Sequence, residues 1–144
     1  AICRKVIYAK LKNKDVIDVG GDGKQTRSFL YIDDCIEGTL KLFNSDFREP
    51  LNIGSDEQVS INQLIDIAEK ISGIKVKKNY QLDKPKGVRG RSSNNDKLKE
   101  VLKWNYSIKL QEGIRKTYSW IHDNMIKNDP DSMKFTKADL KNIK

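Results

Sequence analysis

The chain has 144 residues, of which 37% are hydrophobic and 33% are charged, and its formal net charge is +8. This length suits one compact domain, and no stretch approaches the roughly twenty apolar residues that a membrane-spanning helix needs. The net positive charge implies an anionic partner, because a positive field attracts phosphates.

Cysteine and histidine are too few to support several common kinds of site. Cys3 and Cys35 are the only cysteines, and His122 is the only histidine. The two cysteines are far apart and match no zinc or redox spacing, so we expect reduced thiols in a cytoplasmic protein. A single histidine leaves almost nothing from which to build a metal site or a Ser-His-Asp triad.

The first part of the chain predicts a helix followed by a strand. Ile2, Val6 and Ala9 fall on one side of a helix that continues to about Lys12. Polar residues end that helix, and the apolar run 16–19 predicts a short strand. Because the chain starts without an initiator methionine or a signal peptide, we also expect a fragment of a longer protein.

Residues 20–34 are the most informative stretch. The glycines within positions 20–23 predict a turn, since glycine permits positive φ angles and close approach of the backbone. Arg27 follows as the chain becomes extended, and the apolar run Phe29–Ile32 is typical of a buried strand. Asp34 precedes Glu37 by three residues, the pattern of a capping box. We expect the resulting helix to reach about residue 44, with apolar and small residues at helical spacing: Ile36, Thr39, Leu40 and Phe43.

The next segments continue the alternation of short strands and helices. Residues 50–54, 58–60 and 74–80 are expected strands. Ser60, with Gln63 three residues later, predicts a capped helix that ends at Gly73. Strands that alternate with helices in this way indicate an α/β fold.

The last third predicts a basic loop, two helices and a tail. Residues 82–91 form the irregular basic loop, and residues 92–95 are expected to cap a short helix. A longer helix begins at about Leu110 and is broken at Pro130. We therefore divide the chain into an α/β domain, residues 1–128, and a polar, lysine-rich tail, residues 129–144.

Two stretches have the composition of a phosphate-binding site. Gln25-Thr26-Arg27 follows the glycine turn, and Arg89-Gly90-Arg91 lies beside Ser92 in the basic loop. The planar fork of arginine suits bidentate binding of phosphate, and neighbouring glycines let the backbone come close. Either stretch alone could equally be a surface arginine after a tight turn; the two together favour a bound diphosphate.

The motif Gly-Asp-Gly-x-Gln-Thr-Arg-Ser-Phe-x-x-Ile-Asp-Asp over residues 21–34 resembles a signature of the extended short-chain dehydrogenases/reductases, the nucleotide-sugar epimerases and dehydratases. Further segments resemble the C-terminal portion of the GDP-mannose 3,5-epimerases, and together they cover essentially residues 1–128: Cys3-Arg4-Lys5, 45–57, 87–91, 99–104 and 110–121. The resemblance implies the C-terminal, substrate-binding portion of an extended Rossmann-type epimerase.

The resemblance also implies roles for particular residues. It places Lys5 in the GDP-sugar site, although the spacer from Lys5 to Gln25 is a few residues longer than in the family. Gln25, Thr26 and Arg27 would contact the nucleotide-sugar, and Arg91 would bind its diphosphate. The implied reaction uses NAD to oxidise carbon 4 of the mannosyl ring, so that carbons 3 and 5 become acidic and can be inverted before the hydride returns.

The redox half of such an enzyme is missing from the sequence. The glycine-rich NAD fingerprint and the Tyr-x-x-x-Lys pair are absent, and the family's catalytic cysteine and lysine belong to segments that precede this chain. We therefore expect no catalytic and no cofactor-binding residue here, with NAD bound by an N-terminal domain that acts as a partner. The resemblance further implies a homodimer for the full-length enzyme, and an isolated chain without turnover.

Two readings from other classes remain open. The net charge and a pI near 9.4 suit a basic nucleic-acid-binding module, although no zinc-finger, RRM or helix-turn-helix pattern is present. Alternatively, the chain could be a non-catalytic interaction subunit that keeps the fold. If the chain is instead an isolated half-enzyme, an apolar surface should be exposed where the NAD domain would dock.

Overall fold

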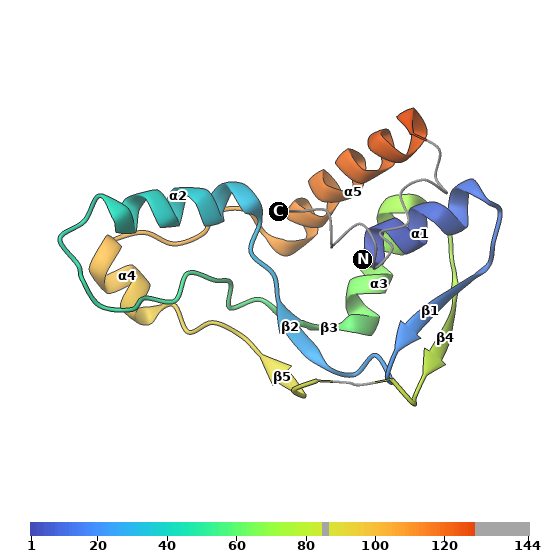
Figure 1. Ribbon diagram of the computed structural model, residues 1–144, viewed down its shortest axis with the longest axis horizontal. Helices are drawn as coiled ribbons and strands as arrows, with labels where there is room; N and C mark the ends of the chain where they lie inside the picture. The colour runs from blue at the N-terminus through green and yellow to red at the C-terminus, as the bar shows by residue number, and fades with distance from the viewer. Residues whose placement is uncertain (85–86, 129–144) are drawn as a thin grey trace, which may run out of the picture.

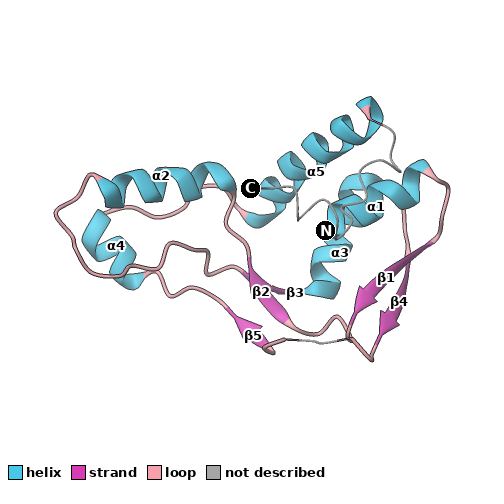
Figure 2. Ribbon diagram, viewed as in Figure 1, coloured by secondary structure: helices cyan, strands magenta, loops and turns pink. Residues whose placement is uncertain are grey.

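The computed structural model describes residues 1–84 and 87–128 as ten helices and strands in one elongated molecule (Figures 1 and 2). Along the chain these are α1 (Ile2–Leu11), β1 (Val16–Gly20), β2 (Thr26–Ser28), α2 (Ile32–Phe43), β3 (Gln58–Ser60), α3 (Ile61–Ser72), β4 (Lys77–Gln81), β5 (Gly90–Arg91), α4 (Asp96–Leu102) and α5 (Leu110–Lys127). The expected tail, residues 129–144, and the helix break at Pro130 lie outside the described residues.

The strands form two small sheets. β1 and β4 pair in parallel, and in the second sheet β2 lies between β3, to which it is antiparallel, and β5, to which it is parallel. Parallel strands connected through helices confirm the predicted α/β class. None of the helices in residues 1–84 and 87–128 is long and apolar enough to cross a membrane.

The hydrophobic core lies at one end of the molecule, between the first sheet and three helices. Its buried residues come from α1, β1, α3, α5 and the entry to β4, and include Val6, Ile7, Val19, Ile65 and Met125. The predicted apolar side of the first helix is confirmed, because Val6 and Ala9 are fully buried there.

α3 begins and ends as its sequence predicts. The Ser60 hydroxyl accepts a hydrogen bond from the backbone N–H of Gln63, and the Gln63 side chain accepts one from the backbone N–H of Ser60. At the other end Gly73 adopts a left-handed conformation with φ of 73°. The cap also anchors β3, which immediately precedes the helix and pairs with β2.

Two predictions about the segment after the glycine turn were wrong. Phe29–Tyr31 is an extended connection rather than a strand, and the strand of this segment is β2, which contains Arg27. α2 begins at Ile32, after Tyr31, and Asp34 does not cap it. The Asp34 carboxylate instead accepts hydrogen bonds from the loop that precedes α5.

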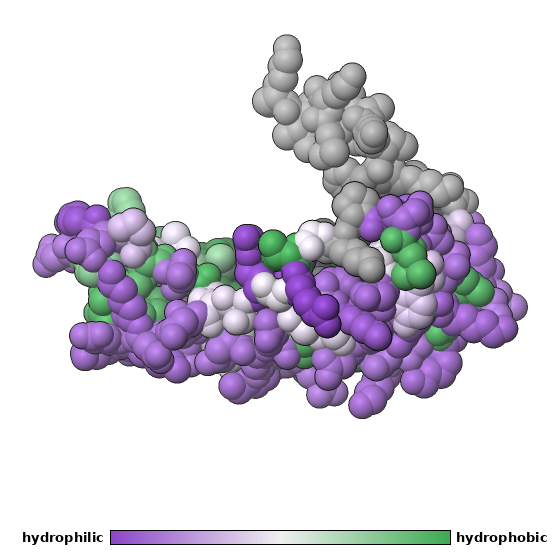
Figure 3. All heavy atoms as spheres, turned by 90° about the horizontal axis from the view of Figure 1, so that it is seen from below, coloured by the Kyte–Doolittle hydropathy of each residue, from purple (hydrophilic) through white to green (hydrophobic). Residues whose placement is uncertain are grey.

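α2 and α4 form the far end of the molecule, away from the hydrophobic core (Figure 1). Long connections join these two helices to the rest of the molecule. The predicted strand at residues 50–54 lies in the connection from α2 to β3, which has no regular structure there. Figure 3 shows a largely hydrophilic face on which hydrophobic atoms gather toward this end. The three-stranded sheet therefore lies between the core and the far end.

Candidate functional site

The three-stranded sheet brings together the two arginine stretches that are more than sixty residues apart in the sequence. β2 and β5 are parallel, with Thr26 opposite Gly90 and Arg27 opposite Arg91. The backbone N–H of Thr26 also donates a hydrogen bond of 2.9 Å to the carbonyl of Arg89. Strand register thus places the two stretches side by side.

Arg27 and Arg91 line one cavity of about 480 Å³, here termed the arginine cavity. Ile53 is the apolar residue of its described lining, and the remaining lining residues are polar: Ser28, Asn52, Ser92 and Ser93. Two arginines that line a cavity beside hydroxyl and amide side chains supply groups that can bind a phosphate or diphosphate and also bond to sugar hydroxyls.

Local contacts position the Arg27 side chain. Its Nη1 donates a hydrogen bond of 2.6 Å to the carbonyl of Thr26, and its Nη2 lies 3.6 Å from the place of a Cβ atom at Gly87. Gly87 has φ of 66°, so the basic loop approaches the guanidinium in a conformation that favours glycine. Within the described residues, neither Arg27 nor Arg91 forms an ion pair with a carboxylate.

A smaller cavity of about 170 Å³ lies on the side of the glycine turn, and we term it the turn pocket. It is lined by Asp22, Lys24, Gln25, Gly87 and Arg89. The Gln25 amide donates through Nε2 to the carbonyl of Gly20 at 3.2 Å, while its Oε1 is buried and has no hydrogen-bond partner in the described part of the chain. A buried acceptor of this kind suits a donor group on a ligand.

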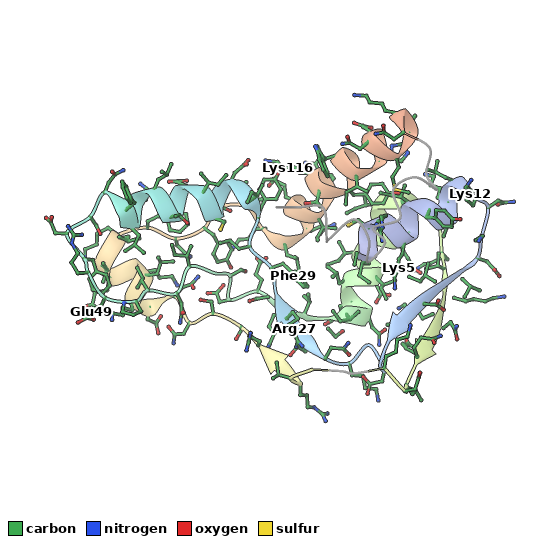
Figure 4. All side chains as sticks on the ribbon, in the orientation of Figure 1. Lys5, Lys12, Arg27, Phe29, Glu49 and Lys116 are labelled. Carbon is green, nitrogen blue, oxygen red and sulfur yellow. The ribbon has the colours of Figure 1, made fainter. Side chains whose placement is uncertain are left out.

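Lys5 lies apart from these two cavities. It lies on α1, and its Nζ donates a hydrogen bond of 2.6 Å to the carbonyl of Asp18 in β1. In Figure 4 Lys5 lies over the end that carries α1 and α3, whereas Arg27 lies on β2 in the middle of the molecule. Lys5 lines neither cavity, and its role in the sugar site stays a prediction.

The two cavities are lined mainly by cationic and polar side chains. Among the described residues, those that line the arginine cavity include no histidine, cysteine, tyrosine or carboxylate, and the turn pocket contributes one carboxylate, from Asp22. Groups of three or more metal-binding side chains do not occur in residues 1–84 and 87–128. The arrangement can neutralise and orient an anion.

Sequence reasoning missed Asn52 and Ser93 as lining residues. Asn52 comes from the long connection after α2, where no turn or periodicity marks it. Ser93 was expected to act as a helix cap, but its hydroxyl donates to the Asn95 side chain at 2.8 Å while the residue lines the cavity. The preceding stretch Arg89-Gly90-Arg91, with Ser92, was the signal that this segment belongs to a site.

Comparison with known proteins places these residues in a family context. Residues 1–117 match the family model described as GDP-mannose 4,6 dehydratase. The chain is 46% identical over 129 residues to the GDP-mannose 3,5-epimerase of Arabidopsis thaliana, covering 88% of this chain and 32% of that protein. It is 34% identical to the UDP-glucuronate 4-epimerase of Thermodesulfobacterium geofontis, over 76% of this chain and 34% of that protein.

A solved structure of a nucleotide-sugar epimerase also resembles this chain. The UDP-glucuronic acid 4-epimerase of Bacillus cereus, in complex with UDP-glucuronic acid and NAD, matches with a TM-score of 0.76 and 32% identity, covering 86% of this chain and 40% of that chain. The chain therefore spans about a third of the length of its sequence relatives. Since the family model matches most of its residues, the chain belongs to the GDP-mannose 4,6 dehydratase family and is similar in sequence to the GDP-mannose 3,5-epimerases.

Proposed function

We propose that this chain is the GDP-sugar-binding part of an NAD-dependent enzyme that resembles GDP-mannose 3,5-epimerase. The observation that carries the proposal is the parallel pairing of Arg27 with Arg91, which places both arginines in the lining of one cavity with hydroxyl and amide side chains. The 46% identity to a GDP-mannose 3,5-epimerase supports a GDP-sugar as the ligand.

Arg27 and Arg91 would hold the two phosphates of the ligand. A guanidinium fork bonds phosphate oxygens bidentately. Their contribution is positioning and charge neutralisation, so that the sugar projects toward the part of the enzyme that carries out the chemistry. Gln25 and Thr26, together with Lys5, complete the predicted contacts.

The described residues do not fit NAD. A dinucleotide site of the Rossmann type has a strand, a glycine-rich turn and then the N-terminus of a helix, which binds the pyrophosphate. Here the glycine turn follows β1 but leads into β2, a strand. NAD, which would accept and return the hydride, belongs in our proposal to another part of the enzyme, and the isolated chain should show no turnover.

Calorimetric titration with GDP-mannose tests the proposal. We expect the wild-type chain to bind GDP-mannose in preference to UDP-glucose. Arg27→Ala and Arg91→Ala each remove a charge-assisted contact, so each should weaken binding by about 1.5–3 kcal/mol, or on the order of 10- to 150-fold. Arg115→Ala removes the same charge from an exposed position of α5 and should leave the affinity unchanged.

Two outcomes would contradict the proposal. If the wild-type chain binds no GDP-mannose, the chain has the fold of the family without a working site, as in a non-catalytic interaction subunit. Salt-dependent binding to duplex DNA that survives Arg27→Ala would favour the basic nucleic-acid-binding module.

A further inference from the structure

Two connections without regular structure form walls of the arginine cavity. Asn52 and Ile53 belong to the connection from α2 to β3, and Ser92 and Ser93 belong to the connection from β5 to α4. In Figure 1 these two connections approach each other near α4. Because these four residues lie outside the strands, contacts other than strand pairing must hold the two walls together.

The Asn95 side chain joins the two walls. Asn95 is only 3% exposed. Its Nδ2 donates hydrogen bonds to the carbonyl of Gly54 at 2.9 Å and to Oδ1 of Asn105 at 3.2 Å. Its Oδ1 accepts a hydrogen bond of 2.8 Å from the hydroxyl of Ser93. The amide thus uses both its donors and its acceptor, and a buried polar group that is bonded in this way makes its surroundings rigid.

Asn95 does not use this side chain for the helix that it precedes. It occupies the N-cap position of α4, but its side chain forms no capping hydrogen bond. An asparagine at this position ordinarily accepts a hydrogen bond from an N–H group of the first turn. The contacts that the amide does make are those that connect the cavity walls.

Gly54 provides the space for this contact. A Cβ atom at Gly54 would lie 2.6 Å from Cβ and 2.9 Å from Oγ of Ser93, so any larger residue would push the walls apart. Gly54 is not among the described glycines with a positive φ, and the position therefore requires a small residue for space and not for backbone conformation. The backbone N–H of Ser93 also donates to the carbonyl of Ser55 at 3.4 Å. We term Gly54, Ser93 and Asn95 the wall contact.

The wall contact lies directly after Arg91 in the chain. β5 consists of only two residues, Gly90 and Arg91, so its pairing with β2 fixes few backbone groups. Ser93, two residues further on, is the next residue held by hydrogen bonds to buried Asn95. The position of Arg91 therefore depends on the wall contact as well as on strand pairing.

We propose that Asn95 and Gly54 are positioning residues of the arginine cavity, which set the distance between its walls and so place Arg91 for the diphosphate of the ligand. This inference rests on the proposed function. Neither residue is among those that line the cavity, so both act through Ser93 and the segment that carries Arg91.

Calorimetric titration with GDP-mannose tests Asn95, because it measures the dissociation constant and the number of competent sites separately. Asn95→Ala should raise the Kd at least about tenfold, since a displaced binding group loses its geometry, while the number of sites per chain stays that of the wild type. A merely structural residue would instead reduce the number of competent sites and leave the Kd of the folded chains unchanged. That result would overturn the inference.

Asn44→Ala is the matched control for Asn95→Ala. Asn44 is an exposed asparagine that follows α2 and does not line the arginine cavity. Its replacement should change neither the Kd nor the number of sites. An equal rise of the Kd in both variants would show that the effect does not come from the wall contact.

A double-mutant cycle tests Gly54 through its close approach to Ser93. Gly54→Ala should raise the Kd for GDP-mannose in the wild-type background. In a Ser93→Gly background the atoms that crowd the new Cβ are gone and the nearest of the contacts to Ser93 is its Cα, at 3.9 Å. There Gly54→Ala should change the Kd by less than about twofold, because the two substitutions are coupled. The same rise in both backgrounds would contradict the proposal.

Hydrogen exchange without ligand separates this inference from the function on which it rests. In Asn95→Ala, peptides that cover residues 52–57 and 91–95 should exchange faster than in the wild type, whereas peptides from α1 and α3 should be unchanged. Unchanged exchange in the two walls would overturn the wall contact, whatever the chain binds. If the wild type binds no GDP-mannose, the proposed function fails, and with it the role of the wall contact in placing Arg91. If it binds GDP-mannose and Asn95→Ala has the same Kd, only the positioning role is wrong.

Discussion

Asp34 shows how a single buried side chain joins two distant parts of this molecule. It is 2% exposed, and its carboxylate accepts hydrogen bonds from the backbone N–H and hydroxyl of Ser107 at 3.0 Å and from the backbone N–H of Ile108 at 2.9 Å. Burial alone would raise the pKa of Asp34, but these donors, with Lys116 nearby, lower it below its ordinary value. The carboxylate thus fixes α2 to the loop before α5.

We predict that Asp34→Asn lowers the free energy of unfolding by about 1–3 kcal/mol at neutral pH, because buried donors lose their acceptor. A lowered folded pKa contributes stability that is complete above the unfolded pKa of about 3.9 and is lost as the pH falls through the folded pKa. The difference between wild type and variant should therefore shrink below about pH 4. Denaturant unfolding at several pH values measures it.

The neighbouring Asp33→Asn serves as the control for Asp34. Asp33 is exposed in the first turn of α2, so its loss should cost at most about 1 kcal/mol through the helix dipole. Equal destabilisation by both variants, or a cost at Asp34 that does not depend on pH, would show that the carboxylate does not hold the loop as described.

Single residues were predictable where their chemistry alone marks them. Arg27, which follows the glycine turn, and Arg91, which lies beside Gly90, could be selected without knowledge of the fold, and their role in binding stays a prediction. Asp34 was assigned to the wrong role, since the spacing to Glu37 fits a cap while its real donors come from residue 107 onward. No local pattern reports a partner more than seventy residues away.

At the scale of elements, the cap of α3 also supports the site. Ser60 begins α3 and ends β3, where it pairs with Thr26 of β2. We predict that Ser60→Ala lowers the free energy of unfolding by about 1 kcal/mol. Ser60→Asp retains a capping oxygen and should recover most of the loss, as thermal or denaturant unfolding can measure.

A serine-to-alanine change on an exposed helix surface is the control for Ser60→Ala. Ser119 is exposed in the middle of α5, and Ser119→Ala should change stability by no more than about 0.5 kcal/mol. If Ser60→Asp is as unstable as Ser60→Ala, the capping oxygen is not the source of the effect.

Helices were predictable in this chain to a greater degree than strands. Periodicity predicts α1, and periodicity together with caps predicts the bounds of α3; both signals lie in or next to the segments themselves. The apolar run at Phe29–Ile32 and the segment 50–54 were predicted as strands but are not, because a strand requires a partner that its own sequence does not specify. In contrast, β2, which contains Arg27, was not predicted as a strand, because the strand was expected at Phe29–Ile32.

At the scale of the whole molecule, the core and the far end differ in packing. The core draws on α1, α3 and α5, while α2 and α4 supply none of its residues. Local opening requires less free energy where fewer apolar contacts are lost. We predict that in the isolated chain the backbone amides of α1 and α3 exchange with solvent most slowly and those of α2 and α4 fastest.

Hydrogen exchange followed by mass spectrometry measures this difference directly. Peptides from α1 and α3 give the reference for the slow limit in the same sample, so no variant is needed. Protection of α2 equal to that of α1 would show that the far end opens only with the whole molecule.

The parallel register of β2 and β5 lowers the stability of the protein without ligand. Arg27 and Arg91 face one another as strand partners, and like charges held side by side repel. In the proposed function, a bound diphosphate would relieve this repulsion, and its binding would shift the balance further toward the folded state. In a cell, where unfolded chains are continually degraded, the lifetime of this protein would follow the supply of its own ligand.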